Sequence, residues 1–184
     1  MTFKPEKGYQ LDCYVDADFA GLWNYEEDQD PVCVKSRTGY VFTLAGCPVH
    51  HVSKLQTEIA LSTLESEYIA LSQAMRELIP TRRILKEIIG HVDPQALQNS
   101  ANIKSTIWED NNGCISTVRA PKLTPRTKHI AIKYHFSRSH ISSEENDTGI
   151  TLAKIESKIQ LADIFTKPLS EVDFSRLRKL LCGW

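Results

Sequence analysis

Four acidic residues occupy four separate stretches of the chain, each beside an apolar segment. They are Asp16 in YVDADFAG, Glu67 in STLESEYIAL, Asp110 in IWEDNNGCI and Asp163 in QLADIFTKPL. Carboxylates that a fold brings together repel one another unless a cation neutralises them, and an all-oxygen ligand set suits Mg²⁺ or Mn²⁺ rather than zinc. The pattern therefore predicts a two-metal site for phosphoryl transfer, as in a nuclease or a polymerase-like enzyme.

Of the first two carboxylates, Asp16 also has an ordinary explanation, whereas Glu67 is more informative. Asp16 and Asp18 share the polar face of an alternating segment over 10–19 that is typical of a strand with one buried face, and the alternation does not choose between a ligand and a solvated side chain. Glu67 lies at the edge of the apolar stripe of a predicted helix, where a carboxylate rarely stands without a partner. Glu65 is expected to point outward, so Glu67 is the stronger candidate.

The other two carboxylates are placed by the elements before and after them. Asp110 directly follows an apolar strand and precedes a helix start, which is the edge where open α/β sheets gather their ligands. Asp163 falls in the first turns of a short helix, where the helix dipole alone would favour an acidic residue. Asn111, next to Asp110, is expected to cap a helix, to contact substrate, or to do both. Only the combination of the four carboxylates is informative.

Composition bounds the kind of protein. The chain has 184 residues, 41% of them hydrophobic and 24% charged, which fits one globular domain with a core of its own. The net charge of -1 neither supports nor excludes nucleic-acid binding. Five cysteines without a CxxC pair indicate reduced thiols in an intracellular protein, and the histidine spacing does not suggest zinc. Residues 1–8 read as a polar extension, and no apolar run is long enough to span a membrane.

Helical and strand periodicities predict the elements that must position the four carboxylates. A capping box at Ser62 starts a helix near Thr63, which Pro80 is expected to break or kink, and a second helical stretch should end at Gly90. Three strands come first and βα units follow, so we expect a mixed five-stranded sheet flanked by helices. The other expected elements are strands at 10–19, 39–45, 49–54, 103–109 and 149–155, and helices over 114–118, 127–141, 159–166 and the C-terminal segment from Phe174.

The sequence resembles the ribonuclease H domain of copia-type (Pseudoviridae) LTR retrotransposon Pol polyproteins. The similar blocks follow the family's order over about 9–181, nearly the whole chain. They are DADFAG, SRTGYVFTLAG, SKLQTEIALSTLESEYIAL, WEDNNGCI, RTKHIAIKYHF and QLADIFTKPL. The last two blocks are the most specific for the family. The resemblance implies an α/β ribonuclease H-like fold in a single domain, 1–184.

The resemblance also implies an activity and a site. Asp16, Glu67, Asp110 and Asp163 would be the catalytic metal ligands, with Asp16 preferred to Asp18. Asp16 and Asp163 would hold the metal ion that activates water, and Asp16, Glu67 and Asp110 the ion that stabilises the leaving 3′ oxygen. Two Mg²⁺ ions would serve, and Mn²⁺ can substitute. The enzyme would cut the RNA strand of RNA–DNA hybrids during reverse transcription, leaving 5′-phosphate and 3′-hydroxyl ends.

Partners follow from the same resemblance. The reverse transcriptase domain of the same polyprotein would be the neighbour, in a cytoplasmic virus-like particle. Asn111, Arg126 and Lys128 are the candidate nucleic-acid contacts, since a duplex needs cations on its phosphates; the basic residues over 122–140 could equally form a solvated helix face. Many relatives carry a histidine shortly before the last aspartate, thought to help product release, and segment 154–159 has none.

Two other functions compete with this prediction. A degenerate domain could grip the hybrid without cutting it, although such domains characteristically lose their metal ligands. A relative that cuts or joins DNA, such as an integrase catalytic domain, typically uses three acidic residues, and the blocks fit it poorly. The presence of all four carboxylates favours the nuclease.

Overall fold

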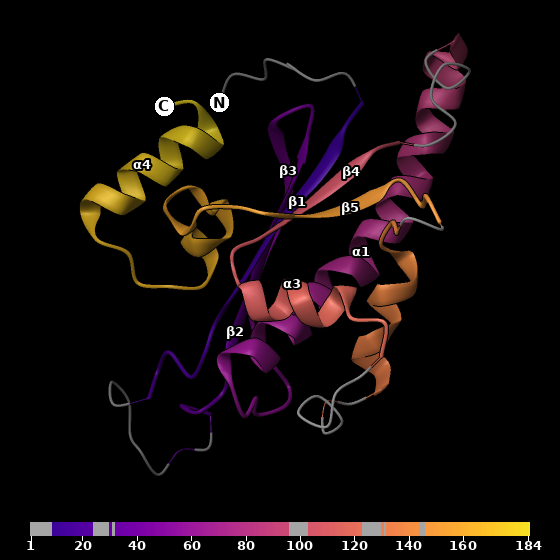
Figure 1. Ribbon diagram of the computed structural model, residues 1–184. Helices are drawn as coiled ribbons and strands as arrows, with labels where there is room; N and C mark the ends of the chain where they lie inside the picture. Colours follow the sequence, from indigo (N-terminus) through magenta and orange to yellow (C-terminus); the bar gives the residue numbers. More distant parts are fainter. Residues whose placement is uncertain are drawn as a thin grey trace.

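A five-stranded mixed sheet forms the centre of the computed structural model, which describes residues 9–23, 30, 32–95, 103–122, 130, 132–143 and 146–184. The strands run in the order β3-β2-β1-β4-β5 (Figure 1). They are β1 (Leu11–Asp18), β2 (Arg37–Leu44), β3 (Cys47–Leu55), β4 (Ser105–Glu109) and β5 (Ile150–Lys154). Strands β1, β2 and β3 pair antiparallel, whereas β4 pairs parallel with both β1 and β5. This topology confirms the predicted mixed sheet, with three antiparallel strands followed by parallel ones.

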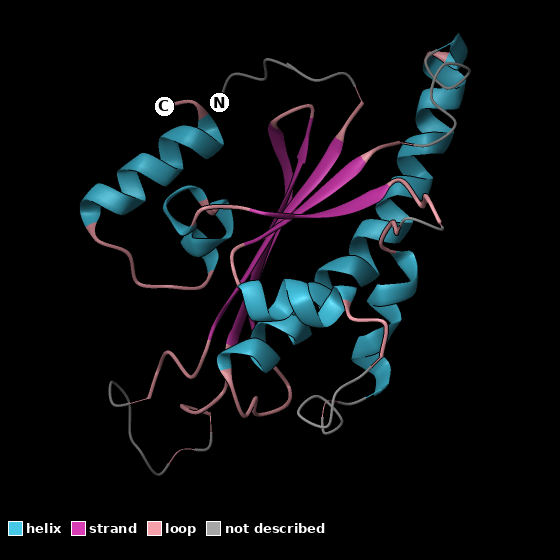
Figure 2. Cartoon of the chain, viewed as in Figure 1, coloured by secondary structure: helices cyan, strands magenta, loops and turns pink. Residues whose placement is uncertain are grey.

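Helices cover both faces of the sheet (Figure 2). On one face, Cys13 and Val15 of β1 pack in the main core with α1 (Thr63–Val92) and α3 (Asn112–Arg119). On the other face, α4 (Glu171–Cys182) packs Leu177 and Leu181 against Val41 of β2 (Figure 1). The prediction that β1 has only one buried face is therefore wrong. As the central strand it is covered twice, so Asp12 and Asp16 are buried as well, while Asp18 at its end stays partly exposed.

Helix α1 begins as the sequence predicts. The Ser62 hydroxyl accepts a hydrogen bond from the backbone N–H of Glu65, and the Glu65 carboxylate accepts one from the backbone N–H of Leu61 at 2.8 Å. These bonds satisfy donors that the first turn of a helix leaves without partners. Glu65 is consequently buried, so the prediction that it points outward is wrong.

Of the break or kink predicted at Pro80, the break is wrong. Helix α1 runs unbroken through Pro80 and ends at the cap residue Asp93, beyond the expected cap at Gly90. Tertiary contacts beyond the proline hold the second half in place, because the Arg82 guanidinium donates hydrogen bonds to the carbonyl oxygens of Ile103 and, at 3.2 Å, Gly149. These bonds tie the helix to the starts of β4 and β5, and they offset the local penalty of the proline.

The remaining helical segments are short and mostly of the 3₁₀ type. They are η2 (Ile132–His140), η3 (Ser157–Ile159) and η4 (Leu161–Phe165). Within the helix predicted over 127–141, the described part Ile132–His140 is a 3₁₀ helix, and residues 127–129 and 131 lie outside the described residues. Within the described part of the chain, no helix has the length and apolar character needed to cross a membrane.

We expect Pro80→Ala to stabilise the protein. Pro80 is exposed inside a continuous helix, so alanine removes no packing and supplies the N–H that the helix lacks. The free energy of unfolding in urea should rise by about 1–3 kcal/mol. Arg83→Ala, at an exposed position of the same helix, should change it by less than about 0.5 kcal/mol. Equal effects of the two substitutions would show that Pro80 imposes no penalty.

Candidate active site

Three of the four predicted carboxylates meet at the carboxyl ends of β1 and β4. Asp16 comes from β1, Glu67 from the first turns of α1, and Asp110 from the residue after β4. One carboxylate oxygen of each lies within 4.8 Å of the others, close enough for a single cation to contact all three. Asp16 and Glu67 are buried, and Asp110 is partly exposed. The parallel pairing of β1 with β4 brings Asp16 and Asp110 to the same edge of the sheet.

Glu67 is held by the start of α1. The buried Gln56 side chain donates hydrogen bonds to the Thr38 hydroxyl on β2, at 3.1 Å, and to the carbonyl oxygen of Ser66, at 2.9 Å. These bonds fasten the first turns of α1 to the sheet next to Glu67. Glu67 Oε2 is buried and has no hydrogen-bond partner among the described residues. A buried carboxylate oxygen without a donor is costly unless it binds a ligand.

Asp163 joins the site through a lysine. The Lys167 ammonium group lies 2.9 Å from Asp16 Oδ1 and 2.9 Å from Asp163 Oδ1, so it forms an ion pair with both carboxylates. The second oxygen of Asp16 accepts a hydrogen bond from the Thr166 hydroxyl. Asp163, on η4, is buried like Asp16. All four predicted carboxylates therefore belong to one site.

The segment that carries Asp163 is fastened to the central strands. The buried Gln160 side chain donates hydrogen bonds to the carbonyl oxygens of Val15, at 2.9 Å, and Trp108, at 3.2 Å, and so bridges β1 and β4 just before η4. Gly39, which pairs with Asp16 across β1 and β2, leaves room for the other end of the segment. A Cβ atom at Gly39 would lie only 2.5 Å from Thr166 Cγ2.

Glu109 is a fifth carboxylate of the site that was not predicted from the sequence. It is fully buried at the end of β4, where Oε1 accepts a hydrogen bond from the backbone N–H of Asn111 at 2.9 Å. Its other oxygen has no partner among the described residues. Alternation in β4 could have revealed it, because Ser105, Ile107 and Glu109 share the buried face. Lys167 was missed too, although it follows Asp163 by only four residues, just beyond the end of η4.

The electrostatics of the site disfavour charged carboxylates. Burial, and then the negative charges of Glu109 and Asp16, raise the pKa of Glu67 far above its ordinary value of 4.5. Burial also raises the pKa of Glu109, against the opposing effect of the hydrogen bond from Asn111. The folded protein without a metal ion therefore holds protons on carboxyl groups that would be ionised in water.

In the pair of Asp16 and Asp163, the positive charge of Lys167 offsets part of the negative charge. Burial and the charge of Asp16 raise the pKa of Asp163, while Lys167 lowers it. Although burial acts against a charged amine, the carboxylates of Asp16 and Asp163 raise the pKa of Lys167, so the ammonium group stays charged. Lys167 is thus the cation that compensates this pair of acids.

Of the three predicted nucleic-acid contacts, the structure describes only Asn111. Asn111 caps α3, since its side chain accepts a hydrogen bond from the backbone N–H of Cys114 at 3.0 Å, which confirms its structural role. Its contact with substrate stays a prediction. Arg126 and Lys128 lie outside the described residues.

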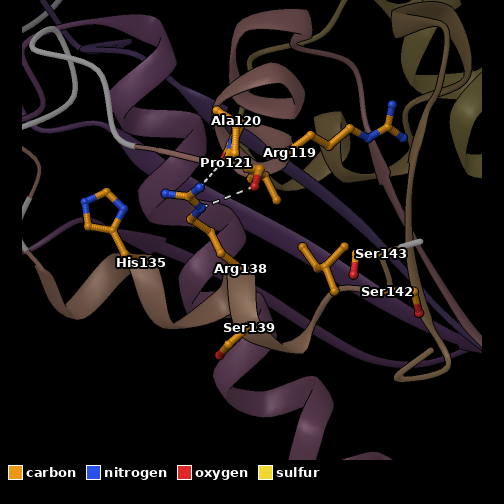
Figure 3. Close-up of a pocket in the computed structure, with 10 residues that line it drawn as sticks. Arg119, Ala120, Pro121, His135, Arg138, Ser139, Ser142 and Ser143 are labelled. Atoms are coloured by element: carbon orange, nitrogen blue, oxygen red, sulfur yellow. Dashed lines mark hydrogen bonds between the residues drawn. The ribbon is translucent and has the colours of Figure 1, made fainter. Parts of the chain in front are cut away.

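Arg138, also from the basic region over 122–140, has a structural role. It projects into a pocket beside His135 and donates hydrogen bonds to the carbonyl oxygens of Val118, at 3.3 Å, and Ala120 (Figure 3). These carbonyls lie at the C-terminal end of α3, where the helix leaves its acceptors without intrahelical partners. Part of the basic region therefore serves to hold η2 against α3.

Sequence comparison places the chain among retroelement proteins. It is 32% identical over 168 residues, 91% of its length, to the retrovirus-related Pol polyprotein from transposon TNT 1-94 of Nicotiana tabacum. It is 31% identical over 169 residues, 92% of its length, to the corresponding polyprotein from transposon RE2 of Arabidopsis thaliana. It spans only 11% and 10% of these relatives. No family model matches the chain.

Solved structures show the same fold. LC11-RNase H1, crystallised in complex with an RNA/DNA hybrid and isolated from compost, superimposes with a TM-score of 0.51 at 14% identity, over 85% of this chain and 94% of that one. The N-terminal RNase H domain of rv2228c from Mycobacterium tuberculosis gives a TM-score of 0.50 at 7% identity, over 94% and 98% of the two chains. The homologues of the chain are thus retrovirus-related Pol polyproteins from copia-type transposons, and its fold is that of ribonuclease H domains. In this Pol domain the carboxylates gather at the ends of the central strands.

We expect Gly39→Ala to disturb the site of the Pol domain. The added Cβ would push Thr166 away and weaken its hydrogen bond to Asp16, which should lower the free energy of unfolding by about 1–3 kcal/mol. Adding Thr166→Ser removes the Cγ2 atom but keeps the hydroxyl, so the double variant should recover part of the loss. Urea unfolding of the two variants and of Thr166→Ser alone measures this coupling, and strictly additive effects would contradict the proposed contact.

The pH dependence of stability should report the buried carboxyls. Because the pKa of Glu67 is raised, the folded metal-free Pol domain binds more protons than the unfolded chain above pH 4.5, so this contribution to stability is lost as the pH rises. Glu67→Gln should make unfolding free energy fall less steeply between about pH 5 and about pH 8. Glu87→Gln, exposed on the same helix, should leave the slope unchanged. Parallel curves for wild type and Glu67→Gln would contradict the raised pKa.

Proposed function

We propose that this Pol domain is a Mg²⁺-dependent endonuclease that hydrolyses the RNA strand of RNA–DNA hybrids and leaves 5′-phosphate and 3′-hydroxyl ends. The observation that carries the proposal is the convergence of Asp16, Glu67 and Asp110, whose ligand atoms lie within 4.8 Å of one another in a chain of this family. Hydrolysis of a phosphodiester by water needs no covalent intermediate with the protein, so a site made of carboxylates suffices.

The donor set fits divalent cations that prefer oxygen. The cluster offers only carboxylate oxygens, and one of them, Glu67 Oε2, is buried without a donor. Asp16, Glu67 and Asp110 would hold one ion, and Asp16 and Asp163 would hold a second. When bound, such a pair of ions supplies an activated water and stabilises the charge on the leaving oxygen. Mn²⁺ has similar ligand preferences and can replace Mg²⁺.

The residues around the carboxylates orient them before substrate arrives. Thr166 fixes the Asp16 side chain, Gln160 fixes the segment of Asp163, and the backbone N–H of Asn111 fixes Glu109, the neighbour of Asp110 in the chain. Preorganised groups of this kind need no rearrangement as charge develops during the reaction. The partly exposed Asp110 leaves the site open to a backbone phosphate on one side.

An RNA–DNA hybrid is the substrate class that the relatives support best. A protein with this fold, LC11-RNase H1, was solved with an RNA/DNA hybrid, and Pol polyproteins of retroelements contain the homologous segment. In the complete polyprotein we place the domain beside the reverse transcriptase domain, where it would remove template RNA. Asn111, Arg126 and Lys128 remain the proposed contacts to the hybrid.

Cleavage of three substrates tests the proposal. With Mg²⁺, the protein should release labelled RNA from an RNA–DNA hybrid, with 5′-phosphate ends, and should leave double-stranded DNA and double-stranded RNA intact. Chelator should abolish the reaction. Binding of the hybrid with no cleavage would instead support a domain that only grips its substrate, and cleavage of double-stranded DNA would support an integrase-like activity.

Two aspartates on the same strand give a matched test of the site. Asp16→Asn should lower cleavage of the hybrid by about 10²-fold or more, because it removes a charge shared by both proposed ions. Asp18→Asn, two residues further along β1, should keep most of the activity. Circular dichroism should show that both variants fold. Full activity of folded Asp16→Asn would sink the assignment.

A further inference from the structure

The Lys167 side chain occupies the place where one of the two proposed metal ions would bind. Its ammonium nitrogen lies 2.9 Å from one oxygen of Asp16 and 2.9 Å from one oxygen of Asp163. These are the two carboxylates that would share an ion apart from the three-carboxylate cluster of Asp16, Glu67 and Asp110. A metal ion bound to the same two oxygens would need the space and the lone pairs that the ammonium group now uses.

The two halves of the site therefore differ before any metal ion arrives. In the three-carboxylate cluster, Glu67 Oε2 has no hydrogen-bond partner among the described residues, and the negative charges repel one another. In the Asp16–Asp163 pair, the charge is already compensated by an ion pair that is largely shielded from water, since Asp16 is buried and one third of the Lys167 side chain is exposed. Removing one partner of a buried ion pair is costly because it leaves the other charge uncompensated, so an incoming ion must replace the ammonium group rather than simply join it.

Lys167 can also leave without unfolding the site. Its side chain is flexible and partly exposed, whereas Asp16 keeps the Thr166 hydroxyl and the segment of Asp163 keeps its bonds through Gln160. The lysine is four residues beyond Asp163, just after the end of η4, and its backbone N–H donates a hydrogen bond to the Asp163 carbonyl oxygen at 3.1 Å, so it remains near the site after its side chain moves.

We propose that Lys167 is an internal cation that holds the Asp16–Asp163 pair together without metal and must be displaced before a divalent ion binds there. The inference rests on the metal-dependent function proposed above and adds an order to it. The first ion enters the three-carboxylate cluster, and the second binds more weakly because it competes with a tethered ammonium group.

Metal binding without nucleic acid tests the order. Mn²⁺ titration of the full chain, followed by electron paramagnetic resonance of the free ion, should give two classes of site in the wild type. Lys167→Met should strengthen the weaker class by about tenfold or more, because it removes the competing charge. Lys179→Met, an exposed lysine on α4, should bind Mn²⁺ like the wild type. Unchanged affinities in folded Lys167→Met would overturn the proposal.

A second measurement needs no variant. In the wild-type protein without metal, NMR of the lysine ammonium groups should show Lys167 protected from exchange by its two carboxylate partners, and Mg²⁺ should remove this signal as the weaker site fills. A Lys167 signal that persists at saturating Mg²⁺ would overturn the proposal. If neither the wild type nor Lys167→Met binds Mn²⁺ in the titration, the result would instead contradict the metal-dependent function itself.

Discussion

Five carboxyl groups lie together where the central strands end, and their mutual repulsion is the constraint around which the fold is built. Burial and the neighbouring charges raise the pKa of Glu67, of Glu109 and of Asp163. Among the described residues, Lys167 is the cation that directly contacts these carboxylates. A fold that keeps several acids in so small a volume gives up stability when it holds no metal ion, and such a cost is typical of sites arranged for function.

The surrounding structure imposes this arrangement through buried polar bridges. Gln56 ties the start of α1 to β2, and Gln160 ties the segment before η4 to both β1 and β4. Each glutamine donates its side-chain N–H groups to backbone or hydroxyl oxygens of two different elements, as buried polar groups generally require. Gly39 then lets η4 approach β2 closely enough for Thr166 to reach Asp16. The carboxylates are thus held in place by contacts between elements that are distant in sequence.

The sequence predicted what depends on local pattern and missed what depends on tertiary contact. The mixed sheet, the capped start of α1 and the four carboxylates follow from periodicity, capping residues and the family blocks. The continuity of α1 through Pro80 was missed because Arg82 anchors it to residues that follow much later in the chain. Glu109 was missed although alternation along β4 places it on the same face as Ser105 and Ile107, and the packing of β4 buries that face. Alternation alone left Asp16 and Asp18 equivalent, whereas the structure buries Asp16 opposite Gly39.

The proposed function depends on the binding of a divalent cation by the acidic cluster. Anomalous diffraction from crystals of the full chain grown with Mn²⁺ tests this most directly, because it locates the ion without reference to activity. The account predicts an anomalous peak in contact with Asp16, Glu67 and Asp110, with Lys167 still paired to Asp163 when only that site is filled. Ordered, fully built carboxylates with no peak near Asp16 at saturating Mn²⁺ would contradict it.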